Sequence, residues 1–414
     1  MVSATNLSIA LGVGWAFGAA VFGVYSFFAL IALLATNLLT AALAEPAAAI
    51  SANLTVSERQ AYFAALAASF VVGTVVALVP LHYFLIFLQQ VFLQSVTINS
   101  ILVTAFVMTL LCAGVLRTFL QAFAPGTVIL GSDLLRSSLA IIALAMVVIA
   151  PRYGIDANPY VSVIALQMAA VVVYLMCCAV YAAAKHFVVR PDFHHFRTHW
   201  PKSRLTTAIT GVRIFQVNAP ILWAQYLLGE EIFGLIRTYQ TIANFVALPL
   251  NALSLNNVSR SAVAFASGGI GSLIRHVTGF LTKLTLATVA GSGAVLLVLF
   301  LLPSDLRPDA RGFLYITLFL ICAVLVAINA SLAAYFHARG RLLPLFLRSA
   351  VGAVIAIVGA PLLLDSMGGI GAPASLLAVS LFVSIATTVF IYRDSRSLSP
   401  DVLGESDHDG PSDD

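Results

Sequence analysis

Charged residues are scarce in this chain. Only 9% of its 414 residues are Asp, Glu, Lys or Arg, whereas about a quarter of a soluble globular protein is charged. A large aqueous domain is therefore excluded, because its surface would need many more charges. With 61% hydrophobic residues and a mean hydropathy of +1.01, the sequence predicts a polytopic membrane protein. The net charge of +4 is modest, and no nucleic-acid partner is implied.

Cysteine is also rare, and all four cysteines lie inside apolar runs: Cys112, Cys177, Cys178 and Cys322. In such surroundings a thiol behaves as a small hydrophobic group. No disulfide framework, metal site or cofactor is predicted.

Three histidines cluster in the middle of the chain, at His194, His195 and His199. Their spacing is compatible with metal ligands, but no cysteine or carboxylate cluster completes a site. We interpret this segment as a solvated basic loop near anionic lipids.

Acidic residues are missing from the apolar runs. Glu45, Asp133 and Asp365 all fall at the edges of predicted spans. Transporters coupled to protons or sodium usually need a buried carboxylate, so such coupling is disfavoured. The connections on the outer side are also too short for a catalytic domain, and we expect no enzyme activity.

The apolar runs predict twelve membrane-spanning helices, since only helices or closed barrels satisfy their backbone polar groups in hydrocarbon and a barrel would alternate. The expected fold is all-α, with two six-helix bundles related by a pseudo-two-fold axis along the membrane normal. The first bundle (1–184) has spans at 4–20, 22–44, 61–83, 98–116, 133–150 and 160–184. A cytoplasmic basic linker (185–206) separates it from the second bundle (207–392), with spans at 207–228, 232–255, 277–302, 313–335, 348–364 and 373–392. Residues 81–93 are apolar enough to lengthen the third helix or to lie at the membrane interface. Residues 393–414 are predicted to be a disordered acidic cytoplasmic tail.

The orientation follows from the distribution of Lys and Arg, which favour the cytoplasmic side. Only Arg152, Arg307 and Arg311 fall in the predicted outer connections. We therefore expect both termini in the cytoplasm. Three cations lie within predicted spans: Arg213, Arg237 and Lys283.

The two halves show a weak internal repeat. Phe22-Gly23 matches Phe233-Gly234 at an offset of 211 positions. Because each half has an even number of helices, both enter the membrane in the same direction, which predicts parallel repeats.

Polar residues concentrate in the seventh and eighth spans. On the eighth, polar groups recur at steps of four and three residues, which places them on one helical stripe: Arg237, Thr241, Asn244 and Asn251. Gln240 lies beside the stripe, and the seventh span adds Arg213 and Gln216.

Two interpretations of these residues stay open. In the first, they line a wet, positively charged cleft that binds an anionic substrate such as a phosphate-bearing lipid headgroup. In the second, Arg213 and Arg237 extend to the interface and the amides hold neighbouring helices together. Under the first, the substrate-binding candidates are Arg237, Gln240, Thr241, Asn244, Asn251, Arg213 and Gln216.

Several segments resemble the polysaccharide-export flippases of the MATE-like MOP superfamily. Residues 18–26 (GAAVFGVYS) are similar to that family's first helical pair, and residues 228–241 (LGEEIFGLIRTYQT) with 248–251 (LPLN) to its eighth helix. Residues 338–341 (ARGR), and Arg117 followed by Gly126 and Asp133, look like its inner turns.

This resemblance implies a flippase in the bacterial cytoplasmic membrane that works by alternating access. Its cargo would be a polyprenyl-pyrophosphate-linked glycan, and its partners membrane lipids and glycan-synthesis proteins. Two alternatives remain: a MATE-like cation-coupled multidrug or metabolite antiporter, and a membrane scaffold of a glycan-synthesis complex.

Overall fold

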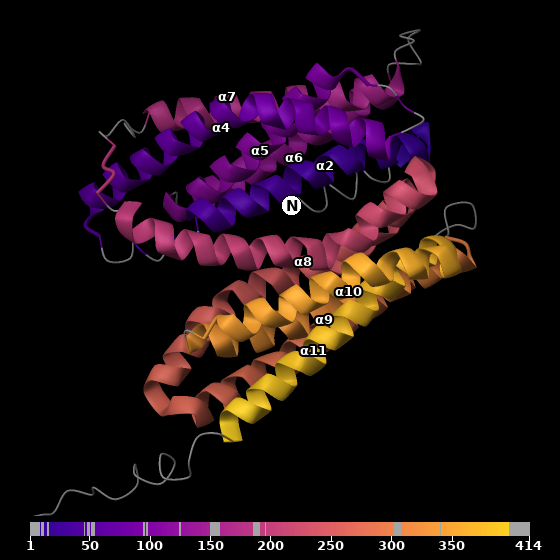
Figure 1. Cartoon of the computed structure of the whole chain (residues 1–414). Helices are drawn as coiled ribbons and strands as arrows, with labels where there is room; N and C mark the ends of the chain where they lie inside the picture. The colour runs from indigo at the N-terminus through magenta and orange to yellow at the C-terminus, as the bar shows by residue number, and fades with distance from the viewer. Residues whose placement is uncertain are drawn as a thin grey trace, which may run out of the picture.

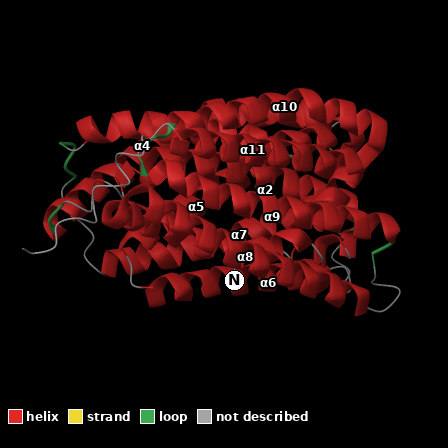
Figure 2. Cartoon of the chain, turned by 90° about the horizontal axis from the view of Figure 1, so that it is seen from below, coloured by secondary structure: helices red, strands yellow, loops and turns green. Residues whose placement is uncertain are grey.

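The computed structural model describes residues 9, 12–14, 16–44, 46–47, 50, 54–93, 96, 98–123, 126–149, 158–184, 191–194, 196–301, 308–339 and 341–396. Within this part of the chain there are helices and short connections but no strands, so the expected all-α fold class is confirmed. Figure 2 shows most of the helices running nearly side by side, with the connections gathered at the two ends.

The first half is a set of long helices. Helix α2 (Ala19–Leu39) follows Gly18, whose φ of 88° is not helical, so a new helix starts after it. At its other end α2 continues into a π-helical turn (Thr40–Ala44). Helix α4 (Val56–Phe92) is longer than the predicted span 61–83, so the expected lengthening over residues 81–93 is confirmed. Its start is fixed by a capping box, in which the Glu58 amide donates to Thr55 Oγ1 and the Thr55 amide donates to Glu58.

Helices α5 (Ser100–Phe123), α6 (Gly126–Ile149) and α7 (Pro159–Ala184) complete the described part of this half. Of the predicted first span, 4–20, the structure describes residues 9, 12–14 and 16–20. Two of its described side chains, Ile9 and Val13, are buried against Ala140 and Leu144 of α6.

The second half begins with one long element, α8 (Phe196–Leu301). Its backbone leaves the helical conformation at Gly229 and at the pair Gly268 and Gly269. These breaks divide α8 into a first (196–228), a second (230–267) and a third (270–301) segment. Helices α9 (Ala310–Ala338), α10 (Leu343–Met367) and α11 (Gly371–Arg396) follow, with a short 3₁₀ turn (Gly368–Ile370) before α11.

Two predicted boundaries need correction. The linker predicted at 185–206 contains the start of α8, because the helix begins at Phe196. Residues 393–396, predicted as the start of the tail, instead belong to α11, which extends to Arg396. Residues 185–190, 195 and 397–414 lie outside the described part, so the predictions for them stay untested.

Eight described segments are long and apolar enough to cross a membrane, and the last of them includes both α10 and α11. Residues 196–262 are not among the eight. This is the stretch in which the sequence places its intramembrane arginines and amides. The most polar helices thus lie in the middle of the chain.

The helices form two groups, with the first part of α8 running along the boundary between them and its later part lying with α9 to α11. Figure 1 shows α2 and α4 to α7 on one side, and α9, α10 and α11 on the other. The main apolar core includes side chains of both groups, and Phe27 of α2 packs edge-on against Phe233 of α8 with ring centroids 6.2 Å apart.

At one end the two groups meet through their backbones. A Cβ on Gly23 would overlap the Glu230 carbonyl oxygen and lie 3.2 Å from the Gly234 nitrogen, while one on Gly234 would overlap the Ala19 carbonyl oxygen and lie 3.0 Å from the Gly23 nitrogen. Both pairs, 19 with 230 and 23 with 234, are 211 positions apart. The contact is therefore reciprocal, as the predicted pseudo-two-fold relation requires. We call this contact the glycine crossing.

The glycine crossing lies beside the break at Gly229, at the end we call outer. The opposite end, which holds Arg117, Arg339 and Arg341, we call inner. These names follow the orientation predicted from the Lys and Arg distribution.

Candidate functional site

Arg237 lies on the second segment of α8, eight residues after the break at Gly229, which places it about 12 Å along the helix from the outer turn. Its Nη1 donates to Gln240 Oε1 at 2.5 Å, and its Nε is buried without a hydrogen-bond partner among the described residues. None of the ion pairs in the described part involves it. A guanidinium at this depth without a carboxylate is costly, which marks it as a candidate functional group.

The remaining residues of the predicted stripe differ in their environments. Gln240 is buried beside Arg237, and Asn244 is exposed. The Thr241 hydroxyl donates to the Arg237 carbonyl at 2.7 Å, which satisfies that donor within the helix. Nothing is described of the Asn251 side chain. Arg237 and Gln240 are thus the two stripe candidates that the structure joins directly.

A second cluster of polar side chains lies where the first segment of α8 meets α10 and α11. Gln216 is buried against α10, where a Cβ on Gly352 would lie 3.2 Å from its Cγ, and its Oε1 has no hydrogen-bond partner in the described part. Arg348 of α10 is also buried, and its Nη1 donates to the Thr387 hydroxyl of α11. The charge of Arg213 acts on Arg348, so we assign these groups to one cluster between α8, α10 and α11.

Arg348 was missed as a candidate. It is the first residue of the predicted span 348–364 and was placed with the cytoplasmic cations. The helix instead begins at Leu343, so Arg348 lies inside it and its side chain is enclosed by α11. A cation at a predicted helix edge was the only signal in the sequence.

The predicted set of site residues therefore falls into two groups. Arg213 lies about 24 Å along the first segment from Gly229, against about 12 Å for Arg237 on the second. No contact in the described part joins the Arg237–Gln240 pair to Gln216. The structure thus places the predicted residues at two levels along α8, and their role in binding a substrate stays a prediction.

His199 is held in a buried inner contact, so its interpretation as part of a solvated loop was wrong. Its Nε2 donates to the Ala42 carbonyl at 2.8 Å, which leaves Nδ1 to accept from the Tyr62 hydroxyl at 2.5 Å. Burial lowers the pKa of His199 from its ordinary value of 6.5, and the hydrogen bond to Ala42 opposes that shift. Thr206 adds a hydrogen bond to the Ala41 carbonyl at 2.7 Å, so the start of α8 is fastened to the end of α2.

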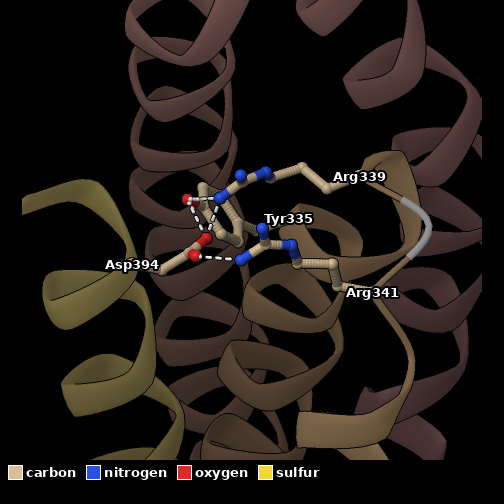
Figure 3. A network of polar contacts seen from close by, with 4 residues as sticks. All are labelled: Tyr335, Arg339, Arg341 and Asp394. Carbon is tan, nitrogen blue, oxygen red and sulfur yellow. Dashed lines mark hydrogen bonds and ion pairs between the residues drawn. The ribbon is translucent and has the colours of Figure 1, made fainter. Parts of the chain in front are cut away.

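Carboxylate-paired arginines occur at the inner end of both halves. Arg117 of α5 donates to both oxygens of Asp133 of α6, at 2.7 and 2.8 Å. In the second half, Asp394 of α11 receives Arg339, Arg341 and the Tyr335 hydroxyl, as Figure 3 shows. Asp394 belongs to the stretch predicted to be a disordered tail, but it closes the inner end of α9 against α11. These arginines are paired with carboxylates, in contrast to Arg237.

Within the described residues, no group of three or more His, Cys, Asp or Glu side chains is placed to hold a metal ion. Two cavities lie at the inner end. One is lined by Arg260, Arg275 and His276 among others, and the other by Leu205, Arg341 and neighbouring apolar residues. The predicted site residues line neither of them.

Comparison with known proteins gives no matching family model and no matching curated protein. Solved structures do match. A multidrug resistance MATE family transporter of the MOP superfamily in an inward-facing conformation has a TM-score of 0.75 at 12% identity, over 96% of each chain. The lipid II flippase MurJ in an inward closed conformation has a TM-score of 0.67 at 10% identity, over 94% of this chain and 85% of the other.

A multidrug resistance MATE family transporter of the MOP superfamily in an outward-facing conformation has a lower TM-score than the inward-facing one. Its TM-score is 0.60 at 13% identity, over 96% of this chain and 92% of the other. Identities this low establish the fold alone, and the printed functions belong to those proteins.

Proposed function

We propose that this chain, which has the fold of the MATE-like transporters of the MOP superfamily, is a membrane transporter that moves a polyprenyl-pyrophosphate-linked oligosaccharide. It would deliver this surface-polysaccharide precursor to the outer leaflet of the bacterial cytoplasmic membrane, among membrane lipids and beside glycan-synthesis proteins. The observation that carries the proposal is Arg237, an intramembrane guanidinium whose partner is an amide and not a carboxylate.

The chemistry of the cargo explains why such an arginine is useful. Each charge or unpaired hydroxyl of a pyrophosphate–sugar headgroup costs several kcal/mol in hydrocarbon. A guanidinium offers a planar fork of donors that matches phosphate oxygens. Gln240 accepts from Nη1 of Arg237 and orients the group, while the buried Nε is left for an incoming acceptor. A guanidinium paired with Asp would already have its charge balanced, and the carboxylate would repel an incoming phosphate.

The glycine crossing supports transport by alternating access. It closes the outer ends of α2 and of the second segment of α8 by direct backbone contact. The higher TM-score with the inward-facing than with the outward-facing MATE transporter agrees with an outer-closed state. Rocking of one bundle against the other would then open this contact and release the headgroup on the outer side.

One observation favours a second candidate. The multidrug MATE transporter scores above the lipid II flippase, 0.75 against 0.67. A cation-coupled antiporter would use a buried carboxylate. Asp133, which was predicted at a span edge, lies seven residues inside α6, but it is already engaged by Arg117.

The test is a flipping assay with the purified protein in liposomes that contain a polyprenyl-pyrophosphate disaccharide in the inner leaflet. A membrane-impermeant lectin reports sugar arriving outside. We expect Arg237→Gln to slow the initial rate by at least about tenfold, the effect of one lost charge-assisted hydrogen bond, and Arg237→Lys to restore part of the rate.

Arg393→Gln is the matched control, because Arg393 is an exposed arginine on α11, and it should flip at the wild-type rate. A wild-type rate for Arg237→Gln would refute the assignment of Arg237. Transport of cationic dyes driven by a proton or sodium gradient, with no flipping of the lipid-linked sugar, would establish the antiporter instead.

A further inference from the structure

The turn between the second and third segments of α8 borders an open cavity at the inner end. The chain reverses at Gly268 and Gly269, the latter with φ 60°. A cavity of about 660 Å³ opens between the two segments. Its polar lining comes from both sides of the turn, with Arg260 and Ser267 before it.

Apart from Val263 and Ala264, the lining consists of side chains that can donate to an anion. Arg275, His276 and Ser272 from the third segment face Arg260 and Ser267 of the second. The sequence has no Asp or Glu between residues 232 and 304, and neither arginine takes part in an ion pair within the described part. Two guanidinium groups therefore share one cavity, and the only carboxylates on their two segments, Glu230 and Glu231, lie at the opposite, outer end of the second segment.

Next to His276, the second segment contributes buried polar atoms that have no hydrogen-bond partner in the described part of the chain. Its Nε2 donates to Asn257 Oδ1 at 3.1 Å. The Asn257 Nδ2 is buried and has no partner in the described part of the chain, and the same holds for Ser261 Oγ. Buried donors normally have partners, so this part of the second segment suits a ligand that carries several acceptor oxygens.

The cavity borders the lipid-facing side of the third segment. Four large apolar side chains follow Arg275 after about three, four, six and seven whole helical turns, and so continue its face of the helix: Leu286, Val289, Leu297 and Phe300. Leu286 is 65% exposed and Phe300 is 61% exposed. In a membrane protein such a face contacts acyl chains. Donors at one end of it lie at the level of the lipid headgroups.

We propose that the cavity between Arg260 and Arg275 binds the headgroup phosphate of an anionic phospholipid of the inner leaflet, with its acyl chains lying along the third segment. Basic pockets between membrane helices on the cytoplasmic side recognise such headgroups. The site lies apart from Arg237, because Arg260 points about 140° away from the Arg237 stripe on an ideal helix. The proposal is therefore independent of the transported cargo.

The test uses the full chain in nanodiscs of phosphatidylglycerol and phosphatidylcholine in equal amounts. Native mass spectrometry counts the lipids that each protein retains. We expect wild-type protein to retain phosphatidylglycerol, and the double variant Arg260→Gln/Arg275→Gln to bind it at least about tenfold more weakly, since each lost charge-assisted bond has that effect.

The control Arg204→Gln/Arg393→Gln removes two exposed arginines from the same side and should retain the lipid as wild type does. A second variant, Ser267→Trp, fills the cavity without changing its charge and should also lose the lipid, which covers the case in which the double variant fails to fold. Equal retention by the wild type and both cavity variants would overturn the proposal.

A further arm distinguishes the source of the phosphate. Thermal unfolding of the wild type in detergent is followed with short-chain phosphatidylglycerol, short-chain phosphatidylcholine or inorganic phosphate. Stabilisation by phosphatidylglycerol alone is the expected result. Equal stabilisation by inorganic phosphate would replace the lipid with a free anion, and equal stabilisation by phosphatidylcholine would show that the site does not select anionic headgroups. Either result overturns the assignment.

Discussion

The outer and inner ends of the molecule follow the internal repeat to different degrees. At the outer end, the glycine crossing obeys the offset of 211 in both of its contacts. At the inner end, Tyr62 of α4 binds His199, whereas Leu273, 211 positions after Tyr62, packs in an apolar cluster with Tyr335 and Phe336. The turn before α4 thus lies beside the Tyr62–His199 hydrogen bond, whereas the equivalent turn at Gly268 and Gly269 lies beside the open basic cavity.

The physical reason lies in the kind of contact. The glycine crossing uses backbone atoms and the absence of side chains, so it survives wherever two glycines are kept. The inner contacts depend on particular side-chain hydrogen bonds, which a single substitution removes. We infer that the outer end preserves the symmetry of the two bundles, and that the inner ends are where the halves have become different.

The largest effect is expected from a substitution that breaks the outer contact. Gly234→Val places a branched side chain against the Ala19 carbonyl, and should destabilise the outer-closed state by at least about 2 kcal/mol, a population shift of more than tenfold. Spin labels at Val161 and Ala310, exposed near the outer ends of the two halves, should move apart. Gly293→Val, where a Cβ meets nothing within 4 Å, should leave the distance unchanged. An unchanged distance in Gly234→Val would contradict the role of the crossing.

A smaller effect is expected at the inner end of the second half. Asp394→Asn leaves Arg339 and Arg341 without their carboxylate, at a cost of about 1–3 kcal/mol for the nearly buried Arg339. The melting temperature in detergent should fall. Asp365→Asn, at an exposed position on α10, serves as the control, and equal melting of the two variants would show that the network in Figure 3 contributes nothing.

The inner contact of the first half should respond more weakly. Tyr62→Phe removes the hydroxyl that donates to His199 and should cost about 1 kcal/mol. Hydrogen exchange of the α8 start, residues 196–206, should become faster. Tyr83→Phe is a matched change on the same helix, because Tyr83 is exposed. If both variants exchange alike, the hydrogen bond does not fasten α8 to the first half.

The smallest effect should appear on changing the pH. Because burial lowers the pKa of His199, the folded contact holds the neutral ring and the unfolded state binds a proton first. Stability from this group is fully present above the ordinary pKa of 6.5 and is lost as the pH falls through it toward the lowered value. The loss of melting temperature between about pH 7.5 and 5.5 should be smaller in His199→Gln than in the wild type. An identical or larger loss in the variant would contradict the assignment.

Much of the fold was predictable because the signals are local. The predicted apolar runs correspond to α2, α4 to α7, the three segments of α8, and α9 to α11. The match of Gly23 with Gly234 indicated that the two halves are related, but it did not predict that these glycines touch. Boundaries were less certain, since polar residues continue a helix beyond the hydrocarbon, as in α4 and at the start of α8.

The candidate site was predictable only in part. The sequence singled out Arg237 and Gln240, which are hydrogen-bonded in the structure. It grouped Gln216 with them because they lie on neighbouring helices. It did not identify Arg348, whose burial depends on Thr387 of a different helix.

The sequence by itself determined that this chain is built of membrane helices, that it consists of two related halves, and that its intramembrane cations lie in the middle of the chain. Those properties depend on length, hydropathy and spacing along one segment. Only the tertiary structure decided that Gly23 and Gly234 touch, that His199 is buried, and that Arg260 and Arg275 face one cavity. Each of these depends on which distant segments lie side by side, and apolar helices of similar composition do not encode their neighbours locally.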